Sequence, residues 1–326
     1  MTIRENWVDW AKSIGIYLVV FGHAFYPTEG YGCDVKNFVY AFHMPLFFFL
    51  SGYLFKKRDS FFCFLKKNVK SLVVPYIFFN VLCCLMDFLL ISDVQFHKKA
   101  VEDFLFGGGH SYSGASWFLL SLFFVRLIAF VSLSGKMWLQ YVILIMTVVV
   151  AYCLPSPLYW GLGACFMAYP FFYVGNVFKR FVLFSKKNVI NFFMGCVSLM
   201  VVFALNIIMG PVSIHSLQFG EVPALYYVEG FAGIMMVCSL CRLVDKFSNR
   251  FVDIFSSGSI VIMGLHGSVF FYVNAVARRF SSAFADDFNN VLFAFVKAAV
   301  ILFLLYYPTI FLQKHAAMFI GNRSKR

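Results

Sequence analysis

The stretch that decides the fold is Val8-Asp-Trp-Ala-Lys-Ser-Ile-Gly-Ile-Tyr-Leu-Val-Val-Phe-Gly-His-Ala-Phe25. It is long enough to cross a bilayer, which takes about 17–25 mostly apolar residues, yet it contains Asp9, Lys12 and His23. A charged side chain costs roughly 2.5–3.5 kcal/mol at the centre of a membrane helix, so such residues face the protein interior and mark functional sites. The stretch therefore predicts a membrane helix whose polar face is turned away from lipid.

The three polar residues are expected to share that face. From Lys12 to His23 a helix makes about three turns plus roughly 20°, which places both side chains on one stripe about 16 Å apart along the axis. Asp9 lies near the same stripe and is expected to pair with Lys12. Snorkelling to the membrane interface is the alternative for Asp9 and Lys12, and a structural hydrogen bond is the alternative for His23. We favour a catalytic His23, because histidine can act as a base near pH 7.

The composition extends this reading to the whole chain. Of its 326 residues, 61% are hydrophobic and 13% are charged, whereas soluble domains have about 45–50% and about 25%. The 45 phenylalanines exclude a disordered chain, and the low cysteine fraction excludes a disulfide scaffold. We expect one all-α, polytopic integral membrane domain over residues 1–326. The ten predicted spans are Val8–Phe25, Phe38–Phe55, Ser71–Ile91, Trp117–Leu133, Trp138–Leu154, Leu158–Phe178, Val189–Met209, Leu225–Leu243, Ser257–Ala277 and Val291–Leu312.

The net charge of +12 is explained by the distribution of basic residues. If the N-terminus is cytoplasmic, most Lys and Arg fall in inner segments, as membrane proteins generally show. The predicted outer loops then hold only Lys36, Lys98, Lys99, Arg278 and Arg279. We therefore expect both termini in the cytoplasm, a location in a bacterial cytoplasmic (inner) membrane, and no nucleic-acid partner.

The second predicted span places another histidine near the depth of His23. It begins close to His43, and its Pro45 and Gly52 are expected to permit a kink and a close helix approach. A packing role is the alternative for His43. Further ionisable residues inside predicted spans are Asp87, Arg126, Glu229, His266 and Lys297.

Two other segments carry weaker signals. Gly107-Gly108-Gly109-His110, in the polar segment between the third and fourth spans, is typical of a flexible loop. Cys238 and Cys241 lack the further Cys or His ligands of a zinc site, so we expect no metal.

The basic run that precedes the third span contains a pair of lysines suited to phosphate. Lys67 and Lys70 are expected to share one helix face, where they can hold the phosphates of a cytosolic cofactor. By charge alone, the general excess of positive residues on the inner side is the favoured explanation for these lysines.

Several of these motifs resemble the acyltransferase 3 family, and most closely its fucose O-acetylase-like and cell-surface glycan O-acetyltransferase branch. The strongest resemblance lies in Asp9-x-x-Lys12-x-Ile14-x-Ile16-x-x-Val19-x-x-Gly22-His23 and in Phe42-His43-Met44-Pro45-Leu46-Phe47-Phe48-Phe49-x-Ser51-Gly52-Tyr53-Leu54. Pro75-Tyr76, Trp117-Phe118-Leu119, Pro170-Phe171-Phe172-Tyr173-x-Gly175 and Ser259-Ile260-x-Ile262-x-x-x-His266 extend it along the chain.

The resemblance implies a chemistry. It implies about ten spans and transfer of an acyl group, usually acetyl, from cytosolic acyl-CoA to a sugar hydroxyl on a polysaccharide or lipid-linked glycan. The family's basic-x10-His pattern falls on Lys12 and His23. Its paired-arginine motif falls on Lys67 and Lys70, and lysine binds phosphate without the bidentate fork of arginine.

The roles expected from this reading are as follows. Lys67, Lys70 and Lys12 hold the phosphates of acetyl-CoA, and Asp9 orients Lys12. His23 is a general base or a transient acyl carrier, and Arg126 or His43 stabilises the oxyanion.

Other readings stay open from the sequence. Glu229 and His266 are candidate charges of the same cavity, and membrane lipids are the remaining partners. A transporter or flippase for a glycan or lipid-linked precursor is the alternative function. A membrane-bound O-acyltransferase that uses His266 is a second enzymatic alternative.

Overall fold

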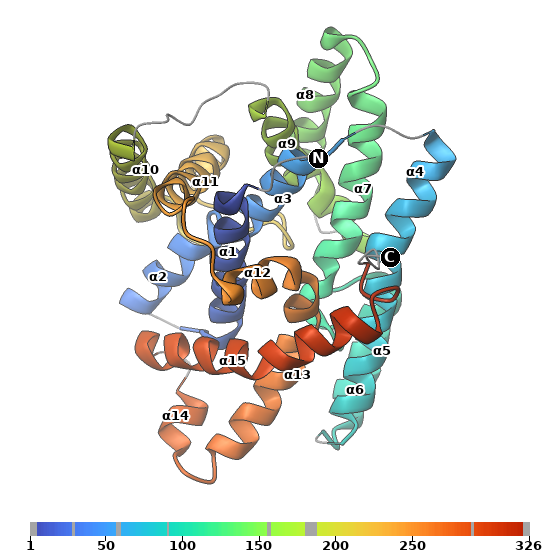
Figure 1. The fold of residues 1–326 in the computed structure, drawn as a ribbon, viewed down its shortest axis with the longest axis vertical. Coiled ribbons are helices and arrows are strands. Elements are labelled where there is room, and N and C mark those ends of the chain that lie inside the picture. The colour runs from blue at the N-terminus through green and yellow to red at the C-terminus, as the bar shows by residue number, and fades with distance from the viewer. Residues whose placement is uncertain are drawn as a thin grey trace.

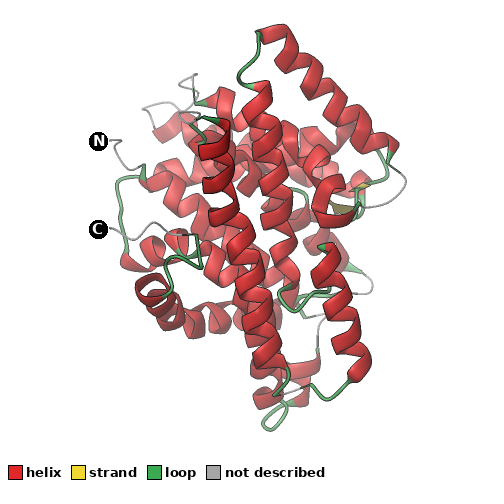
Figure 2. Cartoon of the chain, turned by 90° about the vertical axis from the view of Figure 1, so that its right-hand side faces the viewer, coloured by secondary structure: helices red, strands yellow, loops and turns green. Residues whose placement is uncertain are grey.

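Helices make up nearly all of the structure, a computed structural model that describes residues 5–27, 30–56, 60–89, 91–154, 158–179, 188–287 and 290–321 (Figures 1 and 2). Lys57 and Arg58 of the inner basic run lie outside these ranges, as does the end of the C-terminal tail. The strands in the described part are β1 (Val212–Ser213) and β2 (Gln218–Phe219), which pair antiparallel with Val212 opposite Phe219.

The longer helices follow the predicted apolar stretches. They are α1 (Asn6–Ala24), α7 (Trp117–Ser132), α8 (Met137–Cys153), α9 (Leu162–Phe178), α10 (Asn188–Met209), α11 (Tyr226–Leu243), α13 (Ser259–Ala277) and α15 (Val291–His315). The shorter helices are α2 (Tyr31–Tyr40), α3 (His43–Leu54), α4 (Phe61–Asn68), α5 (Val74–Asp87), α6 (Val94–Phe106), α12 (Arg250–Ser257) and α14 (Ser282–Asp286). Single turns are η1 (Val69–Val73), η2 (Gly114–Ser116), η3 (Tyr159–Gly161) and η4 (Pro223–Leu225).

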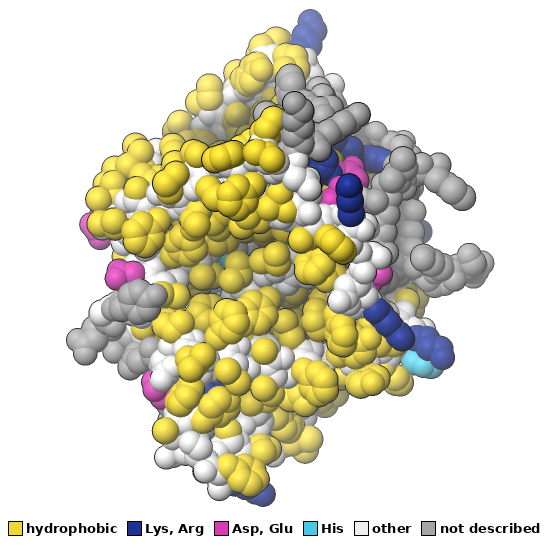
Figure 3. All heavy atoms as spheres, turned by 60° about the vertical axis from the view of Figure 1, so that its left-hand side comes forward, with side chains coloured by type: hydrophobic (Ala, Val, Ile, Leu, Met, Phe, Trp, Pro, Cys, Tyr) yellow, Lys and Arg dark blue, Asp and Glu magenta, His cyan; other side chains and the backbone are white. Residues whose placement is uncertain are grey.

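Seven helices of the described ranges are long and apolar enough to cross a membrane. They are Phe61–Asp87, Gly114–Ser132, Tyr159–Phe178, Asn188–Met209, Pro223–Leu243, Ser259–Ala277 and Val291–His315, and α8 is a shorter apolar helix. Large apolar side chains such as Phe193, Phe203 and Phe303 are exposed, and one face of the molecule is mostly hydrophobic (Figure 3). Because water disfavours so large an apolar surface, this is a multi-pass membrane protein. The count of ten spans and the orientation of the termini stay predictions.

The second predicted span is two helices instead of one. The chain leaves the helix at Ala41 and Phe42, between α2 and α3, and Phe42 has a non-helical backbone. Pro45 explains the break, since it has no N–H for the carbonyl of Ala41 and its ring clashes with that carbonyl in a continuous helix. The break places His43 at the first turn of α3.

The third predicted span begins earlier than expected, so that Lys66, Lys67 and Lys70 belong to it. α4, η1 and α5 form one apolar helix over Phe61–Asp87, with a π-helical turn at η1. This wide turn precedes Pro75 and accommodates the hydrogen bond that proline cannot make. Lys67 and Lys70 therefore lie on a helix. At the other end of the chain, α15 continues through Pro308 to His315, three residues beyond the predicted end at Leu312.

α1 is the central helix of the bundle (Figure 1). It contacts α2, α3, α11, α12, α13 and α15, which explains how a helix with charged residues is accommodated. α3 packs closely on α9, because Gly52 faces the backbone of Phe172 and Gly175 faces the backbone of Phe49. A methyl group at either glycine would overlap a carbonyl oxygen, so these two helices approach as only glycine allows.

Candidate active site

Two histidines from distant parts of the sequence meet at the end of α1. The ring centroids of His23, in the last turn of α1, and His266, in α13, are 4.9 Å apart with planes tilted by 60°. Both line a cavity of about 740 Å³. Its walls include Tyr26, Phe96 and Phe271, with Asp287 at one side. This volume lies within the range of about 300–1,000 Å³ that small-molecule sites usually occupy.

A second, smaller cavity adjoins the first, and His23 lines both. Its volume is about 250 Å³, and its lining includes Tyr40, His43, Trp117 and His215. The ring of His43 packs on Tyr40 with centroids 4.7 Å apart, and His215 packs on Trp117 at 4.9 Å. His23 thus lines two chambers, and the walls of these chambers contain hydroxyls, imidazoles and aromatic rings.

The loop from Gly107 to Ser116 contributes to the walls of both chambers. The Ser113 hydroxyl donates to the carbonyl of Gly264 in α13 at 2.8 Å, while its N–H donates to Oδ1 of Asn80 at 3.1 Å. The Asn80 amide donates to the Ser116 hydroxyl at 3.0 Å. The His110 N–H donates to Asp103 of α6 at 2.8 Å. Gly107–His110 is a loop, as predicted, and these bonds tie His110 to α6 and the following Ser113 and Ser116 to α5 and α13.

Hydrogen bonds fix the proton on two of the buried imidazoles. Nδ1 of His43 lies 2.9 Å from the carbonyl oxygen of Val39, and Nδ1 of His266 lies 3.0 Å from the carbonyl oxygens of Ile262 and Met263. A carbonyl oxygen only accepts, so Nδ1 carries the proton in both rings. In the neutral form their Nε2 atoms are therefore bases.

His23 has a different partner. Its Nδ1 lies 3.3 Å from the hydroxyl of Tyr26. A phenolic hydroxyl donates or accepts, so this contact allows either neutral tautomer of His23. The Tyr40 hydroxyl donates to the carbonyl of Gly22 at 3.3 Å and supports the same turn of α1.

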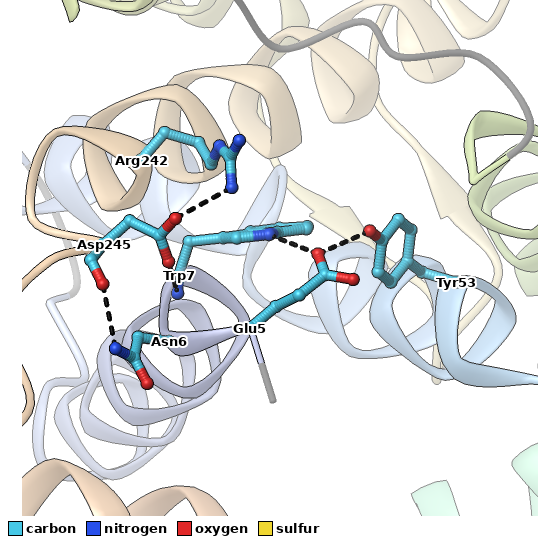
Figure 4. Close-up of polar contacts among 6 residues, drawn as sticks. All are labelled: Glu5, Asn6, Trp7, Tyr53, Arg242 and Asp245. Carbon is cyan, nitrogen blue, oxygen red and sulfur yellow. Dashed lines mark hydrogen bonds and ion pairs between the residues drawn. The ribbon is translucent and has the colours of Figure 1, made fainter. Parts of the chain in front are cut away.

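The opposite end of α1 is held by charged and aromatic groups (Figure 4). Asp245 accepts from the backbone N–H of Trp7 at 2.8 Å and from Arg242 at 2.9 Å. Glu5 accepts from the Trp7 indole and from the Tyr53 hydroxyl, both at 2.7 Å. The bond to Asp245 satisfies the free N–H of Trp7 in the first turn of α1, and the side-chain bonds help to fix the helix that presents His23.

The other predicted site residues lie away from the two chambers. Asp9 accepts a hydrogen bond from Ser256 of α12, and Lys12 is half-buried in the same half of α1. Lys67 and Lys70 are exposed on the helix that includes η1. Nη1 of Arg126 approaches the Ser71 hydroxyl of η1 at 3.5 Å, and Glu229 is buried in α11. Within the described ranges, Arg126 and Glu229 line neither chamber.

Two lining histidines were not predicted. His110 and His215 lie in loops that carry no helical periodicity, and only the folded chain brings them to His23. The available signal was histidine itself. The chain has seven histidines, and five of them line these chambers. Across the described residues, no three His, Cys, Asp or Glu side chains are grouped so that they could hold a metal ion.

The chain is similar to known proteins. A family model described as an acyltransferase domain matches residues 5–310. Nodulation protein NolL of Mesorhizobium japonicum (strain LMG 29417 / CECT 9101 / MAFF 303099) is 32% identical to this chain over an alignment of 129 residues. The alignment covers 37% of this chain and 34% of that protein. The match therefore spans about a third of the relative's length. No solved structure matches the chain.

Proposed function

This chain belongs to the acyltransferase 3 family and is a membrane acyltransferase, and from that premise we propose that it is an O-acetyltransferase. The donor is cytosolic acetyl-CoA, and the acceptor is a hydroxyl of a cell-surface polysaccharide or a lipid-linked sugar. The observation that carries the proposal is His23, which lines two adjoining cavities at one end of α1, together with other imidazoles and hydroxyl groups.

The donor side of the proposal rests on the positive charges. Lys67 and Lys70 are exposed on one helix, where their ammonium groups can bind the phosphates of CoA. Lys12 lies between the N-terminal end of α1 and His23, and we assign it the inner part of the acyl-CoA path. Lysine acts here as a point charge without the planar fork of arginine.

The acceptor side rests on the lining of the chambers. Aromatic rings at Tyr26, Phe96 and Phe271 offer flat apolar surfaces, while Asp287 and the serine hydroxyls offer hydrogen bonds. Such a combination suits a sugar, which has apolar ring faces and a belt of hydroxyl groups. NolL is named as a nodulation protein, and that name does not specify the sugar of this chain.

Within the proposed reaction, His23 is the general base for the sugar hydroxyl or the transient carrier of the acyl group. His43 lines the chamber beside it, whereas Arg126 does not. His43 therefore has the better position to stabilise the oxyanion. Because its Nδ1 proton is given to Val39, it can donate to an oxyanion only as the imidazolium, with Nε2 also protonated.

The remaining expectations follow the same premise. Membership of the family removes the support for a transporter or flippase and for a membrane-bound O-acyltransferase that uses His266 alone. A bacterial cytoplasmic membrane, with the chambers on the outer side, is part of the proposal.

The test is turnover of labelled acetyl-CoA by purified, reconstituted protein, with label followed to water, to protein and to a mixed glycan and glycolipid extract of bacterial envelopes. We expect His23→Ala to abolish transfer. His315→Ala, which removes an exposed imidazole on α15, is expected to retain it. If neither acetyl-CoA nor succinyl-CoA is consumed with any extract, the proposal is wrong.

A further inference from the structure

The contact between His23 and His266 supplies two imidazoles where the proposed function needs only one. Their ring centroids are 4.9 Å apart, and both rings face the cavity of about 740 Å³. His266 is almost fully buried, with 2% of its surface exposed. Transfer through an acyl-enzyme requires a nucleophile and, in the second step, a base for the acceptor hydroxyl. The two imidazoles can supply the nucleophile and the base that this two-step route requires.

The hydrogen bonds of His266 favour the role of base. Ile262 and Met263, one turn earlier in α13, each place a carbonyl oxygen 3.0 Å from Nδ1. These bonds keep the proton on Nδ1, fix the ring orientation and stabilise the imidazolium once Nε2 has taken up a proton. Among the described residues, no side chain or backbone group hydrogen-bonds to Nε2. Nε2 is thus a fixed base at the cavity.

The surroundings of His23 favour the role of carrier. Its ring lines both chambers, so a group bound in either chamber can reach it. Its Nδ1 contacts the hydroxyl of Tyr26, which accommodates either tautomer and either order of proton movement. A group that is acylated and then deacylated changes its protonation in each step, and a partner that both donates and accepts suits such a group.

We propose that His23 carries the acyl group and that His266 takes the proton of the acceptor hydroxyl; this rests on the proposed function. In the first step, the unprotonated nitrogen of His23 attacks the thioester carbonyl, a C–N bond forms and the C–S bond breaks. The proton on the other nitrogen of His23 passes to the departing thiolate, so CoA leaves as the thiol. In the second step, the acceptor oxygen attacks the acyl carbon while Nε2 of His266 takes its proton. The C–N bond breaks, and the proton passes to His23, which returns to neutral imidazole.

The decisive variant is His266→Asn. The asparagine amide nitrogen lies near the position of Nδ1 and can still donate to Ile262 and Met263, but the basic Nε2 is lost. Labelled acetyl-CoA is added to reconstituted protein without acceptor, and label on the peptide that contains His23 is measured after a rapid quench. Envelope extract or water alone then serves as the acceptor in a chase.

We expect His266→Asn to label His23 at close to the wild-type rate and to lose label at least 100-fold more slowly, since a general base contributes about 10²–10⁴. His23→Ala is expected to give no label. His315→Asn, the matched control outside the cavity, should label and discharge as wild type. Free imidazole added to His266→Ala should restore discharge, which a purely structural loss would not allow.

Three results would overturn this inference while leaving the proposed function intact. They are wild-type discharge by His266→Asn, loss of labelling in a folded His266→Asn, and steady transfer by wild type with no labelled His23 at any quench time. If wild-type protein consumes no acyl-CoA at all, the proposed function fails, and that result is distinct from the other three.

Discussion

The contact between α3 and α9 offers a quantitative test of the fold. Gly52 of α3 faces the carbonyl of Phe172, and Gly175 of α9 faces the carbonyl of Phe49. Replacing either glycine by alanine places a methyl group against backbone, which cannot rotate away as a side chain can. Overpacking of this kind costs about 1–3 kcal/mol, and the better helix propensity of alanine returns about 0.5–1 kcal/mol. We expect a net loss of up to about 2.5 kcal/mol for Gly52→Ala and for Gly175→Ala.

The double variant Gly52→Ala/Gly175→Ala tests whether the two glycines act on the same helix contact. Both methyl groups force the same two helices apart, so the second should cost less than the first, and their combined loss should be smaller than the sum of the single losses. Independent sites would give simple addition. Gly267→Ala in α13 is the matched control, because an added methyl group there meets no atom within 4 Å. It should leave stability unchanged or raise it slightly.

The assay is unfolding in mixed micelles by titration with sodium dodecyl sulfate, followed by tryptophan fluorescence. The free energy of unfolding of each variant is compared with that of wild type. The reasoning is refuted if Gly52→Ala unfolds at the same detergent fraction as Gly267→Ala, because the close approach of α3 and α9 would then be absent.

Three other predictions test separate parts of the molecule. Replacing both Lys67 and Lys70 by alanine should raise KM for acetyl-CoA at least tenfold with a smaller change in kcat, and replacing both by arginine should restore KM. If wild type and the two double variants have equal kinetics, these residues do not bind the donor. Asp245→Ala removes the carboxylate that caps α1 at Trp7 and should lower the free energy of unfolding by about 1–2 kcal/mol in the same titration, whereas an unchanged midpoint would contradict the cap. Burial lowers the pKa of His215, so the unfolded chain binds more protons than the folded one as pH falls below about 6.5. Stability should therefore decline on acidification, and His215→Gln should decline less steeply; parallel pH curves would exclude this contribution.

The sequence predicted most of the helices because their signal is local. Apolar length and composition predicted α7, α9, α10, α11, α13 and α15, with ends displaced by a few residues. The same properties predicted one continuous span where α2 and α3 are separate helices. The consequence of Pro45 was foreseen as a kink, but the size of the break depends on how α3 packs against α9 and α11.

The family and the polar face of α1 were also determined by the sequence alone. The interval from Asp9 to His23 is fixed by helix geometry, and the motif around it belongs to a recognisable family. The spacing from Asp9 to His23 does not determine which groups lie next to His23 in the folded chain. His266 was one of several buried charges with no predicted partner, and His110 and His215 were not among the predicted site residues.

Only the tertiary structure decided that His23 and His266 lie in contact and that His23 lines two adjoining chambers. Contacts of this kind depend on where helices far apart in the chain cross, and the crossing is set by steric details such as Gly52 against the Phe172 backbone. The loop from Gly107 to Ser116 likewise depends on bonds to Asn80 and Gly264, which lie on α5 and α13. Hydrophobic periodicity determines which face of a helix is buried, because burial is a property of each residue. It does not determine which buried faces meet, because that depends on shape complementarity summed over the whole bundle.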